Sequence, residues 1–249
     1  KQFKSKKIKK YFCVSTDKAA NPVNMMGASK KIMEMFLMNI SNDINISTAR
    51  FANVAFSDGS LLHGFNQRLL KNQPIVAPND ISRYFVTPKE SGELCLLSCI
   101  FGYNRDIYFP KLEESLHAQK FSDIAINFLK KNGLSPAYCD DEEEARNFNF
   151  NKNKNLWPIL LSSSDTTGEK EIEEFYTLDE TIDFSQYNSI GVVKNELHQN
   201  DHKLNQFEID LEELYVNGQW TKKDLVKIFN NILENFNYED KGKYLDSKM

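Results

Sequence analysis

The first 54 residues alternate between strand-like and helix-like patterns, and this alternation limits the possible folds more than any other feature of the chain. The apolar, β-prone run 11–14 predicts a strand, and we expect it to be central in its sheet. Residues 26–41 show helical spacing, and residues 46–54 return to a strand pattern. The expected buried stripe of the helix consists of Ser29, Met33, Phe36, Leu37 and Ile40. The order strand, helix, strand predicts parallel neighbouring strands joined by a right-handed crossover, and therefore an α/β fold.

Further elements are predicted along the rest of the chain. Helices are expected over 61–71, 89–101 and 121–132, with short strands near 74–76 and 106–110. The acidic run 140–144 predicts the start of another helix, because acidic side chains are favoured at helix N-termini. The last predicted helix covers 222–236 and has Thr221 as its N-cap.

The composition excludes several classes of protein. Of the 249 residues, 41% are hydrophobic and 27% are charged, and no apolar run approaches the roughly 20 residues of a membrane span. The net charge of -4 argues against a nucleic-acid partner. The four cysteines form no CxxC pair, so we expect reduced thiols in a cytoplasmic protein. His198 and His202 lack the glutamate of an HExxH motif, so no metal site is expected.

The loop after the first predicted strand, together with the start of the following helix, is the part most informative about chemistry. Thr16, Asp17 and Lys18 follow that strand, at the carboxyl end where open α/β sheets bind ligands. Met26 and Lys30 lie four residues apart and therefore share a helix face. An acid beside an amine offers a proton donor and a proton acceptor to one substrate, as general acid–base catalysis requires. Asp17 and Lys18 taken alone are better explained as a surface salt bridge, so the assignment depends on the whole segment.

The segment VSTDKAANPVNMMGASK resembles the active-site segment of the extended short-chain dehydrogenase/reductase family, and within it the 4,6-dehydratases that act on UDP-N-acetylglucosamine. The similarity continues through RFANVAFSDGS, DISRYFVT, SDTTGEK and GKYLDSKM, so it covers nearly the whole chain. It looks closest to the soluble dehydratases of bacterial nonulosonic acid pathways, the legionaminic acid type. The resemblance implies a partial Rossmann-like parallel sheet with a smaller α+β substrate-binding lobe. The expected parts are the carboxyl part of a dinucleotide-binding domain (1–56), a substrate-binding lobe with returning Rossmann elements (57–136) and an α+β carboxyl-terminal extension (137–249).

The resemblance also implies an internal redox cycle with NAD(P) as cofactor. Hydride leaves sugar C4, water is eliminated across C5 and C6, and hydride returns to C6, which gives a UDP-4-keto-6-deoxy sugar. In this scheme Lys18 takes the C5 proton and Asp17 protonates the departing C6 hydroxyl. Lys30 binds the nicotinamide ribose, and Phe51 and Ala52 contact the cofactor.

Three further residues fall where related enzymes hold the nucleotide diphosphate: Asn53, Ser60 and Arg83. Arg83 is suited to a bidentate phosphate contact. The alternative for this group is a capping asparagine and a structural arginine.

Two departures from the family pattern matter. Met26 replaces the tyrosine of YxxxK, so the hydroxyl that serves the sugar O4 is absent and Thr16 or Asp17 must assist that step. The ten glycines include no G-x-G, so the GxGxxG fingerprint is not among these residues. We therefore expect the carboxyl part of a longer enzyme, which is a homo-oligomer when intact. The alternatives are a UDP-sugar epimerase of the same family, against which the Asp17–Lys18 pair argues, and an inactive fragment without the cofactor half. The choice between NAD and NADP stays open.

Overall fold

The computed structural model describes residues 8–111, 118–164, 174–196, 201–234, 236 and 238. The chain forms two compact units that interleave along the sequence. The first unit takes its described residues from the stretches 1–52, 89–113 and 173–240, and the second from 53–88 and 114–172. The predicted division of the chain into parts 1–56, 57–136 and 137–249 stays a prediction. The units themselves show that the stretch after residue 137 contributes to both.

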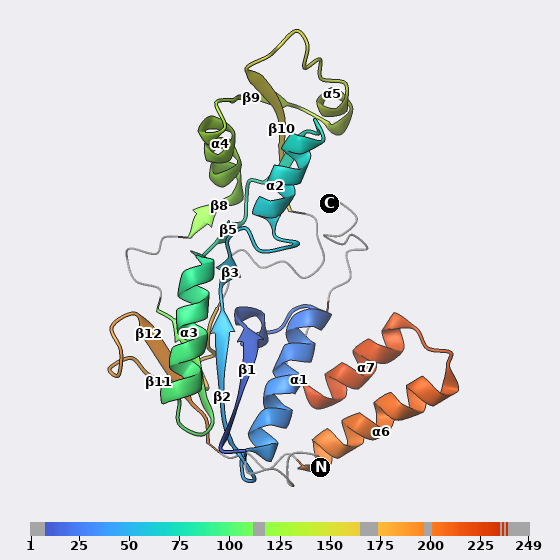
Figure 1. Ribbon diagram of the computed structural model, residues 1–249. Helices are drawn as coiled ribbons and strands as arrows, with labels where there is room; N and C mark the ends of the chain where they lie inside the picture. The colour runs from blue at the N-terminus through green and yellow to red at the C-terminus, as the bar shows by residue number, and fades with distance from the viewer. Residues whose placement is uncertain are drawn as a thin grey trace. The chain divides into compact units, whose positions relative to one another are not determined.

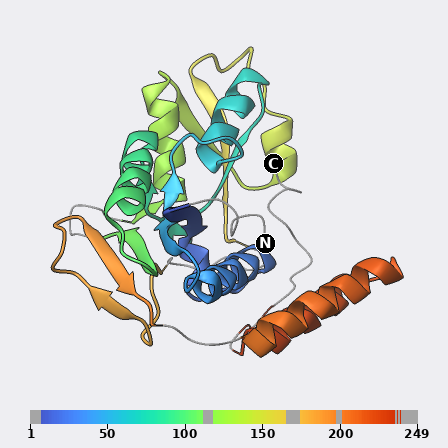
Figure 2. The same cartoon turned by 60° about the horizontal axis from the view of Figure 1, so that its bottom comes forward.

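The first unit is built on a five-stranded sheet in the order β1, β2, β7, β12, β11. Figure 1 labels β1, β2, β12 and β11 of this sheet. Its strands are β1 (Lys10–Thr16), β2 (Asn45–Phe51), β7 (Asp106–Pro110), β12 (Ile190–Lys194) and β11 (Thr181–Asp183). β1, β2 and β7 are parallel, whereas β12 runs antiparallel to β7 and to β11, the orange pair in Figure 2. The ladder aligns Tyr11 with Ile46 and Thr16 with Phe51. The predicted parallel pair is therefore confirmed.

β1 lies at the edge of the described sheet, so the expectation of a central strand is wrong for this sheet. Tyr11 and Val14 are 37% and 44% exposed although they belong to the apolar run. A short apolar run indicates a strand, but it does not tell how many neighbours that strand pairs with.

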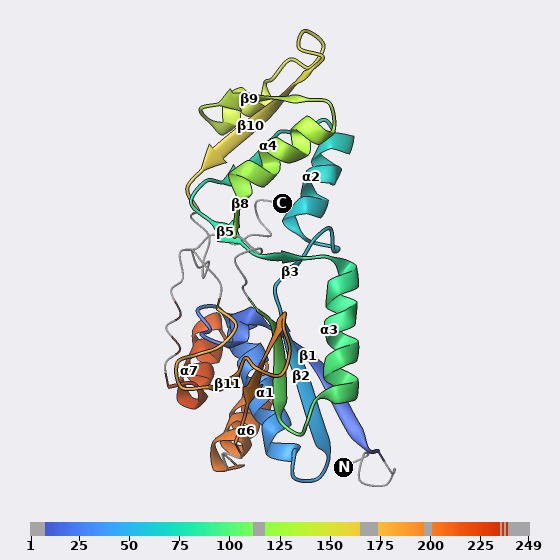
Figure 3. The same cartoon turned by 90° about the vertical axis from the view of Figure 1, so that its left-hand side faces the viewer.

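Helices cover both faces of this sheet. α1 (Met25–Ile40) and α3 (Pro88–Phe101) lie on opposite faces (Figure 3). Two later helices, α6 (Asp201–Asn217) and α7 (Lys222–Ile232), pack against α1. Thr221 caps α7 as predicted and closes a capping box with Asp224, but the helix ends at Ile232 instead of residue 236.

The predicted buried stripe of α1 is largely wrong. Of its five residues only Leu37 is buried, and Ile40 is 46% exposed. The structure buries Ala28 and Ile32 against α6 and α7 and buries Glu34 against the sheet. The prediction of a single apolar stripe failed because α1 packs on more than one side. One side meets α6 and α7, and another meets the charged side chain of Arg50 on β2.

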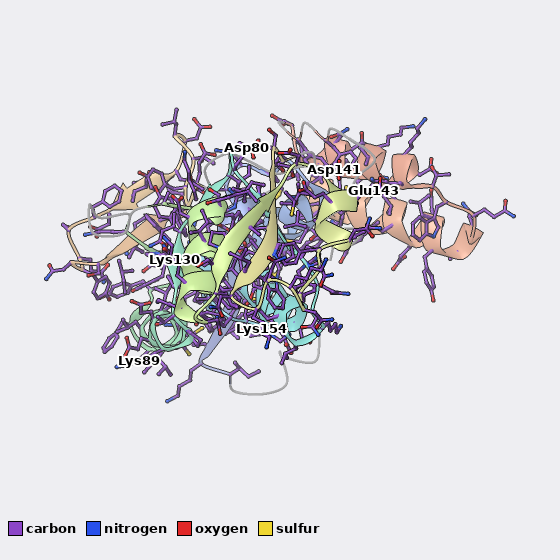
Figure 4. All side chains as sticks on the ribbon, turned by 90° about the horizontal axis from the view of Figure 1, so that it is seen from above. Asp80, Lys89, Lys130, Asp141, Glu143 and Lys154 are labelled. Carbon is purple, nitrogen blue, oxygen red and sulfur yellow. The ribbon has the colours of Figure 1, made fainter. Side chains whose placement is uncertain are left out.

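The second unit contains a parallel sheet in the order β4, β10, β9. Its strands are β4 (Ile75–Pro78), β10 (Leu156–Ser162) and β9 (Ser135–Cys139), and its helices are α2 (Leu61–Leu70), α4 (Phe121–Lys131) and α5 (Glu142–Arg146). Two short ladders pair β3 (Asn53–Val54) with β6 (Phe85–Val86) and β5 (Ser82–Arg83) with β8 (Gln119–Lys120). Asp141 caps α5, where Figure 4 labels Asp141 and Glu143, so the predicted acidic helix start is confirmed. Within the described parts of the chain, no helix is long and apolar enough to cross a membrane.

A buried arginine ties together β2, α1 and the segment that precedes β11. Arg50 is fully buried, and all five of its N–H groups have acceptors. Nε and Nη2 donate to Glu34 at 3.0 and 2.7 Å, and Nη1 and Nη2 donate to Glu180 at 2.8 and 2.7 Å. The remaining Nη1 hydrogen meets the carbonyl oxygen of Phe175 at 2.9 Å. Ser15 of β1 donates to Glu34 at 2.6 Å, so the network reaches the edge strand.

The electrostatics of this network favour its charged form. Burial by itself lowers the pKa of Arg50, but the attraction of Glu34 and the hydrogen bonds to both carboxylates outweigh burial and raise the pKa above its usual value. Burial likewise raises the pKa of Glu180, but the hydrogen bond and charge of Arg50 hold it below its usual value. Arg50 and Glu180 therefore stay charged at neutral pH.

We predict that Arg50→Gln lowers the free energy of unfolding by about 3–5 kcal/mol, because it leaves two buried carboxylates without their cation. Arg146→Gln is the control, since Arg146 forms a surface pair with Glu142 at 3.0 Å and is 74% exposed; it should cost roughly 0.5 kcal/mol or less. Urea unfolding followed by circular dichroism measures both. Equal losses in the two variants would contradict the structural role of Arg50.

Candidate active site

The predicted catalytic loop follows β1 as a short 3₁₀ helix, η2 (Asp17–Ala19), with Thr16 as its N-cap. The Thr16 hydroxyl donates to Asp17 Oδ1 at 2.6 Å. The backbone N–H and the Nζ of Lys18 donate to the same oxygen at 2.8 and 3.3 Å. One oxygen of Asp17 is therefore held by three donors.

The other oxygen of this carboxylate has no such partner. Asp17 is 1% exposed, and its Oδ2 is buried without a hydrogen bond to any described residue. Leaving a buried polar atom unpaired costs free energy, and such atoms in folded proteins call for a specific explanation. Since Lys18 is only 29% exposed and Asp17 is buried, the pair is not an ordinary surface salt bridge. Asp17 Oδ2 is the atom of this loop best suited to meet a substrate group or to hold a proton.

The start of α1 lies directly against η2 (Figure 1). Asn24 caps the helix and accepts a hydrogen bond from the Gly27 N–H at 2.8 Å. A Cβ at Gly27 would lie 2.5 Å from the carbonyl oxygen of Lys18, so only glycine permits this approach. The preceding residue, Met26, is 49% exposed. Lys30, one turn further along α1, is partly buried and forms no hydrogen bond or ion pair with the residues that the structure describes.

The residues predicted to contact the cofactor are the last residue of β2, Phe51, and the residue after it, Ala52. Phe51 and Ala52 are 8% and 7% exposed, and the ladder places Phe51 opposite Thr16. The Phe51 side chain packs with Leu94 and Tyr108 in the core of the first unit. The structure thus puts this strand end beside the predicted catalytic loop, and contact with a cofactor stays a prediction.

The three predicted substrate-binding residues belong to the second unit. Asn53 donates from its backbone and side chain to the Tyr84 carbonyl oxygen at 3.3 and 3.4 Å, so it lies beside the segment that carries Arg83. Arg83 is 5% exposed, donates to the Ser82 carbonyl at 2.9 Å and lies 5.9 Å from the Phe121 ring centre. Ser60 caps α2 by accepting from the His63 N–H at 3.2 Å. Ser60, and not Asn53, is therefore the cap, and the phosphate contacts stay predictions.

Sequence reasoning missed the buried charges behind the catalytic loop: Glu34, Arg50 and Glu180. One sequence signal could have indicated a buried charge: Arg50 is a charged residue within a predicted strand and stands between Ala49 and Phe51. Its partner Glu180 lies 130 residues further along the chain, which no local pattern indicates.

Some predicted features lie outside the described residues: residues 1–7, most of SDTTGEK, His198 and GKYLDSKM. Within the described stretches, no group of three or more His, Cys, Asp or Glu side chains is arranged to hold a metal ion.

Residues 1–193 match the family described as "Polysaccharide biosynthesis protein". The chain belongs to this family. The capsular polysaccharide biosynthesis protein CapD of Staphylococcus aureus is 28% identical over 178 residues, which cover 70% of this chain and 28% of CapD. A UDP-N-acetylglucosamine 4,6-dehydratase (inverting) of Campylobacter jejuni is 24% identical over 185 residues, 71% of this chain and 51% of that protein. The family predicted from the sequence is confirmed.

Solved structures share the fold. Pen from Bacillus thuringiensis superposes with a TM-score of 0.60 at 19% identity, over 78% of this chain and 55% of Pen. A UDP-glucuronic acid 4-epimerase from Bacillus cereus, in complex with UDP-glucuronic acid and NAD, gives 0.50 at 16% identity, over 69% and 54%. The predicted α/β class with a Rossmann-like parallel sheet is confirmed. The first three curated relatives are matched over only 28%, 21% and 52% of their lengths, so this family member spans about half of them or less.

We predict that Gly27→Ala destabilises the first unit by about 1–3 kcal/mol, because the new methyl group must displace the Lys18 backbone. Gly92→Ala is the matched control: Gly92 is also helical and a Cβ there meets nothing within 4 Å, so this change should stabilise by roughly 0.5–1 kcal/mol. Urea unfolding compares the two. A Gly27→Ala variant as stable as the control would show that η2 and α1 do not meet as described.

Proposed function

We propose that this chain supplies the acid–base residues of a nucleotide-sugar 4,6-dehydratase that converts UDP-N-acetylglucosamine to a UDP-4-keto-6-deoxy sugar, with NAD(P) as cofactor. One observation carries the proposal: Asp17 is buried, with three donors on Oδ1 and none from the described residues on Oδ2. Membership of a polysaccharide biosynthesis family and similarity to the Campylobacter jejuni dehydratase support it. The proposal includes a cytoplasmic enzyme that is a homo-oligomer when intact.

Asp17 and Lys18 divide the elimination between them. Asp17 Oδ2 delivers the proton to the departing C6 hydroxyl, while the donors on Oδ1 keep the carboxyl group in one orientation. Lys18 Nζ takes the C5 proton. Since Nζ lies 3.3 Å from Oδ1, the two groups can serve adjacent carbon atoms of one sugar. Met26 brings no hydroxyl, so the proton at O4 is moved by Thr16 or Asp17.

The residues of this chain fit the nicotinamide end of NAD(P). When bound, the cofactor supplies the hydride acceptor and donor of the cycle. Lys30 is partly buried and has no acceptor among the described residues, so its ammonium group can donate to ribose hydroxyls. Phe51 ends the neighbouring strand β2, and Ala52 follows it. With no G-x-G in the sequence, we assign no residue of this chain to the dinucleotide phosphates.

The nucleotide diphosphate of the substrate is assigned to Asn53, Ser60 and Arg83. Ser60 caps the N-terminus of α2, and a helix N-terminus favours phosphate because its first N–H groups point outward. The guanidinium of Arg83 adds a fixed positive charge. The alternative activity, a UDP-sugar epimerase, uses the same fold and performs no elimination, so it needs neither an acid at the C6 hydroxyl nor a base at C5.

We predict that Asp17→Asn lowers formation of the 6-deoxy product by about 10²–10⁴-fold, because the amide preserves the shape of the carboxyl group but delivers no proton. Lys18→Ala should abolish deuterium exchange from solvent at C5. Both are measured by NMR, with UDP-N-acetylglucosamine in deuterated buffer and the natural protein that contains this chain.

Lys89→Ala serves as the control, since Lys89 is 85% exposed and, among the residues that the structure describes, pairs only with Glu93 at the surface. It should leave product formation and exchange unchanged. Exchange at C5 that survives in Lys18→Ala would assign the base to another residue, and a C4 epimer as the only product would favour the epimerase.

A further inference from the structure

A tight turn in the second unit holds an aromatic residue in a conformation that L-amino acids rarely adopt. The backbone N–H and the hydroxyl of Ser57 both donate hydrogen bonds to the Val54 carbonyl oxygen, at 3.4 and 2.9 Å. These bonds close a four-residue turn over 54–57. Phe56 occupies its third position with φ of +59°. A turn with positive φ at this position ordinarily has Gly or Asn there, and a bulky side chain is an outlier.

The packing of the second unit does not explain why this position is Phe. The neighbouring Ala55 packs against the apolar core, but Phe56 is 55% exposed. Its ring stacks on no aromatic ring and faces no cation within the described part of the chain. The strained backbone at Phe56 is therefore not compensated by burial of its side chain. Strained residues of this kind concentrate at ligand sites, where the strain fixes the position of a side chain.

The turn lies between residues already assigned to the substrate. Asn53 precedes it on β3, and Ser60 follows it at the N-terminus of α2, a helix of ten residues. A phosphate group bound at this helix end has the rest of its nucleotide within a few ångströms. An exposed aromatic ring on the adjoining turn is suited to stack on a nucleobase. Every nucleobase has a flat π-face, so any of them can stack on an aromatic side chain.

We propose that Phe56 is a binding residue that stacks on the nucleobase of the nucleotide sugar, and that the turn holds it in place for that contact. The inference rests on the proposed function, because it takes the nucleotide diphosphate to lie at Ser60. It adds a binding residue on the nucleotide side, in addition to the acid–base residues of the first unit.

The test compares stability with nucleotide binding in three variants of the natural protein that contains this chain. Phe56→Gly removes the ring and the strain, Phe56→Tyr keeps both, and Tyr138→Ala removes another exposed aromatic ring of the second unit, 61% exposed. Calorimetry measures binding of UDP and of UDP-N-acetylglucosamine, and thermal unfolding measures stability. We expect Phe56→Gly to melt at a higher temperature than the natural chain and to bind both ligands at least tenfold more weakly. Phe56→Tyr and Tyr138→Ala should bind within twofold of the natural chain.

The outcomes separate this inference from the proposed function. UDP affinity within twofold of the natural chain in Phe56→Gly would overturn the inference and leave the function standing. Weaker binding of the sugar nucleotide with unchanged UDP binding would also overturn it, because the ring would then meet the hexose. A lower melting temperature in Phe56→Gly would assign Phe56 a packing role instead. If the unaltered natural protein that contains this chain binds neither ligand, the proposed function itself is contradicted.

Discussion

The guanidinium group of Arg50 is the interaction on which the first unit depends. It joins two carboxylates from distant parts of the chain, Glu34 on α1 and Glu180 before β11. Through Glu34 it also fixes Ser15, two residues before Asp17. The two elements that carry the proposed acid–base residues, the end of β1 and the start of α1, therefore keep their mutual position by a buried, fully hydrogen-bonded charge network and by the close approach at Gly27.

Three poorly exposed carboxylates of this unit, Glu34, Glu180 and Asp17, fall into two kinds. Both carboxylate oxygens of Glu34 and of Glu180 accept hydrogen bonds. These bonds compensate the cost of burying the charges, so the two residues stabilise the fold. Asp17 gives only one oxygen to donors within the described structure, and the other remains buried and unpaired. The contrast distinguishes a carboxylate that holds the fold from one suited to chemistry. Burial alone would not separate them, because all three side chains are at most about one-tenth exposed.

Much of the fold could be predicted because its signals are local. Spacing and short polar signals predict the parallel pair β1–β2, the helices up to Lys131, the acidic helix start at 140–144 and the cap Thr221 of α7. They did not predict α6 or the strands β9 to β12. The juxtaposition of Thr16, Asp17 and Lys18 with the start of α1 follows from the strand–helix order. The edge position of β1, the two-sided burial of α1 and the interleaved units depend on contacts between residues far apart in sequence. Glu180 illustrates the limit, since nothing near it in the sequence points to Arg50.

The most direct test of the proposed chemistry follows the hydride that is removed from the sugar. UDP-N-acetylglucosamine with deuterium at C4 is incubated with the natural protein and NAD(P), and the product is examined by NMR and mass spectrometry. A 4,6-dehydratase returns the same hydride to another carbon, so the account predicts a 6-deoxy product with deuterium at C6. Deuterium that stays at C4 of an epimerised sugar, with the C6 hydroxyl intact, would contradict it.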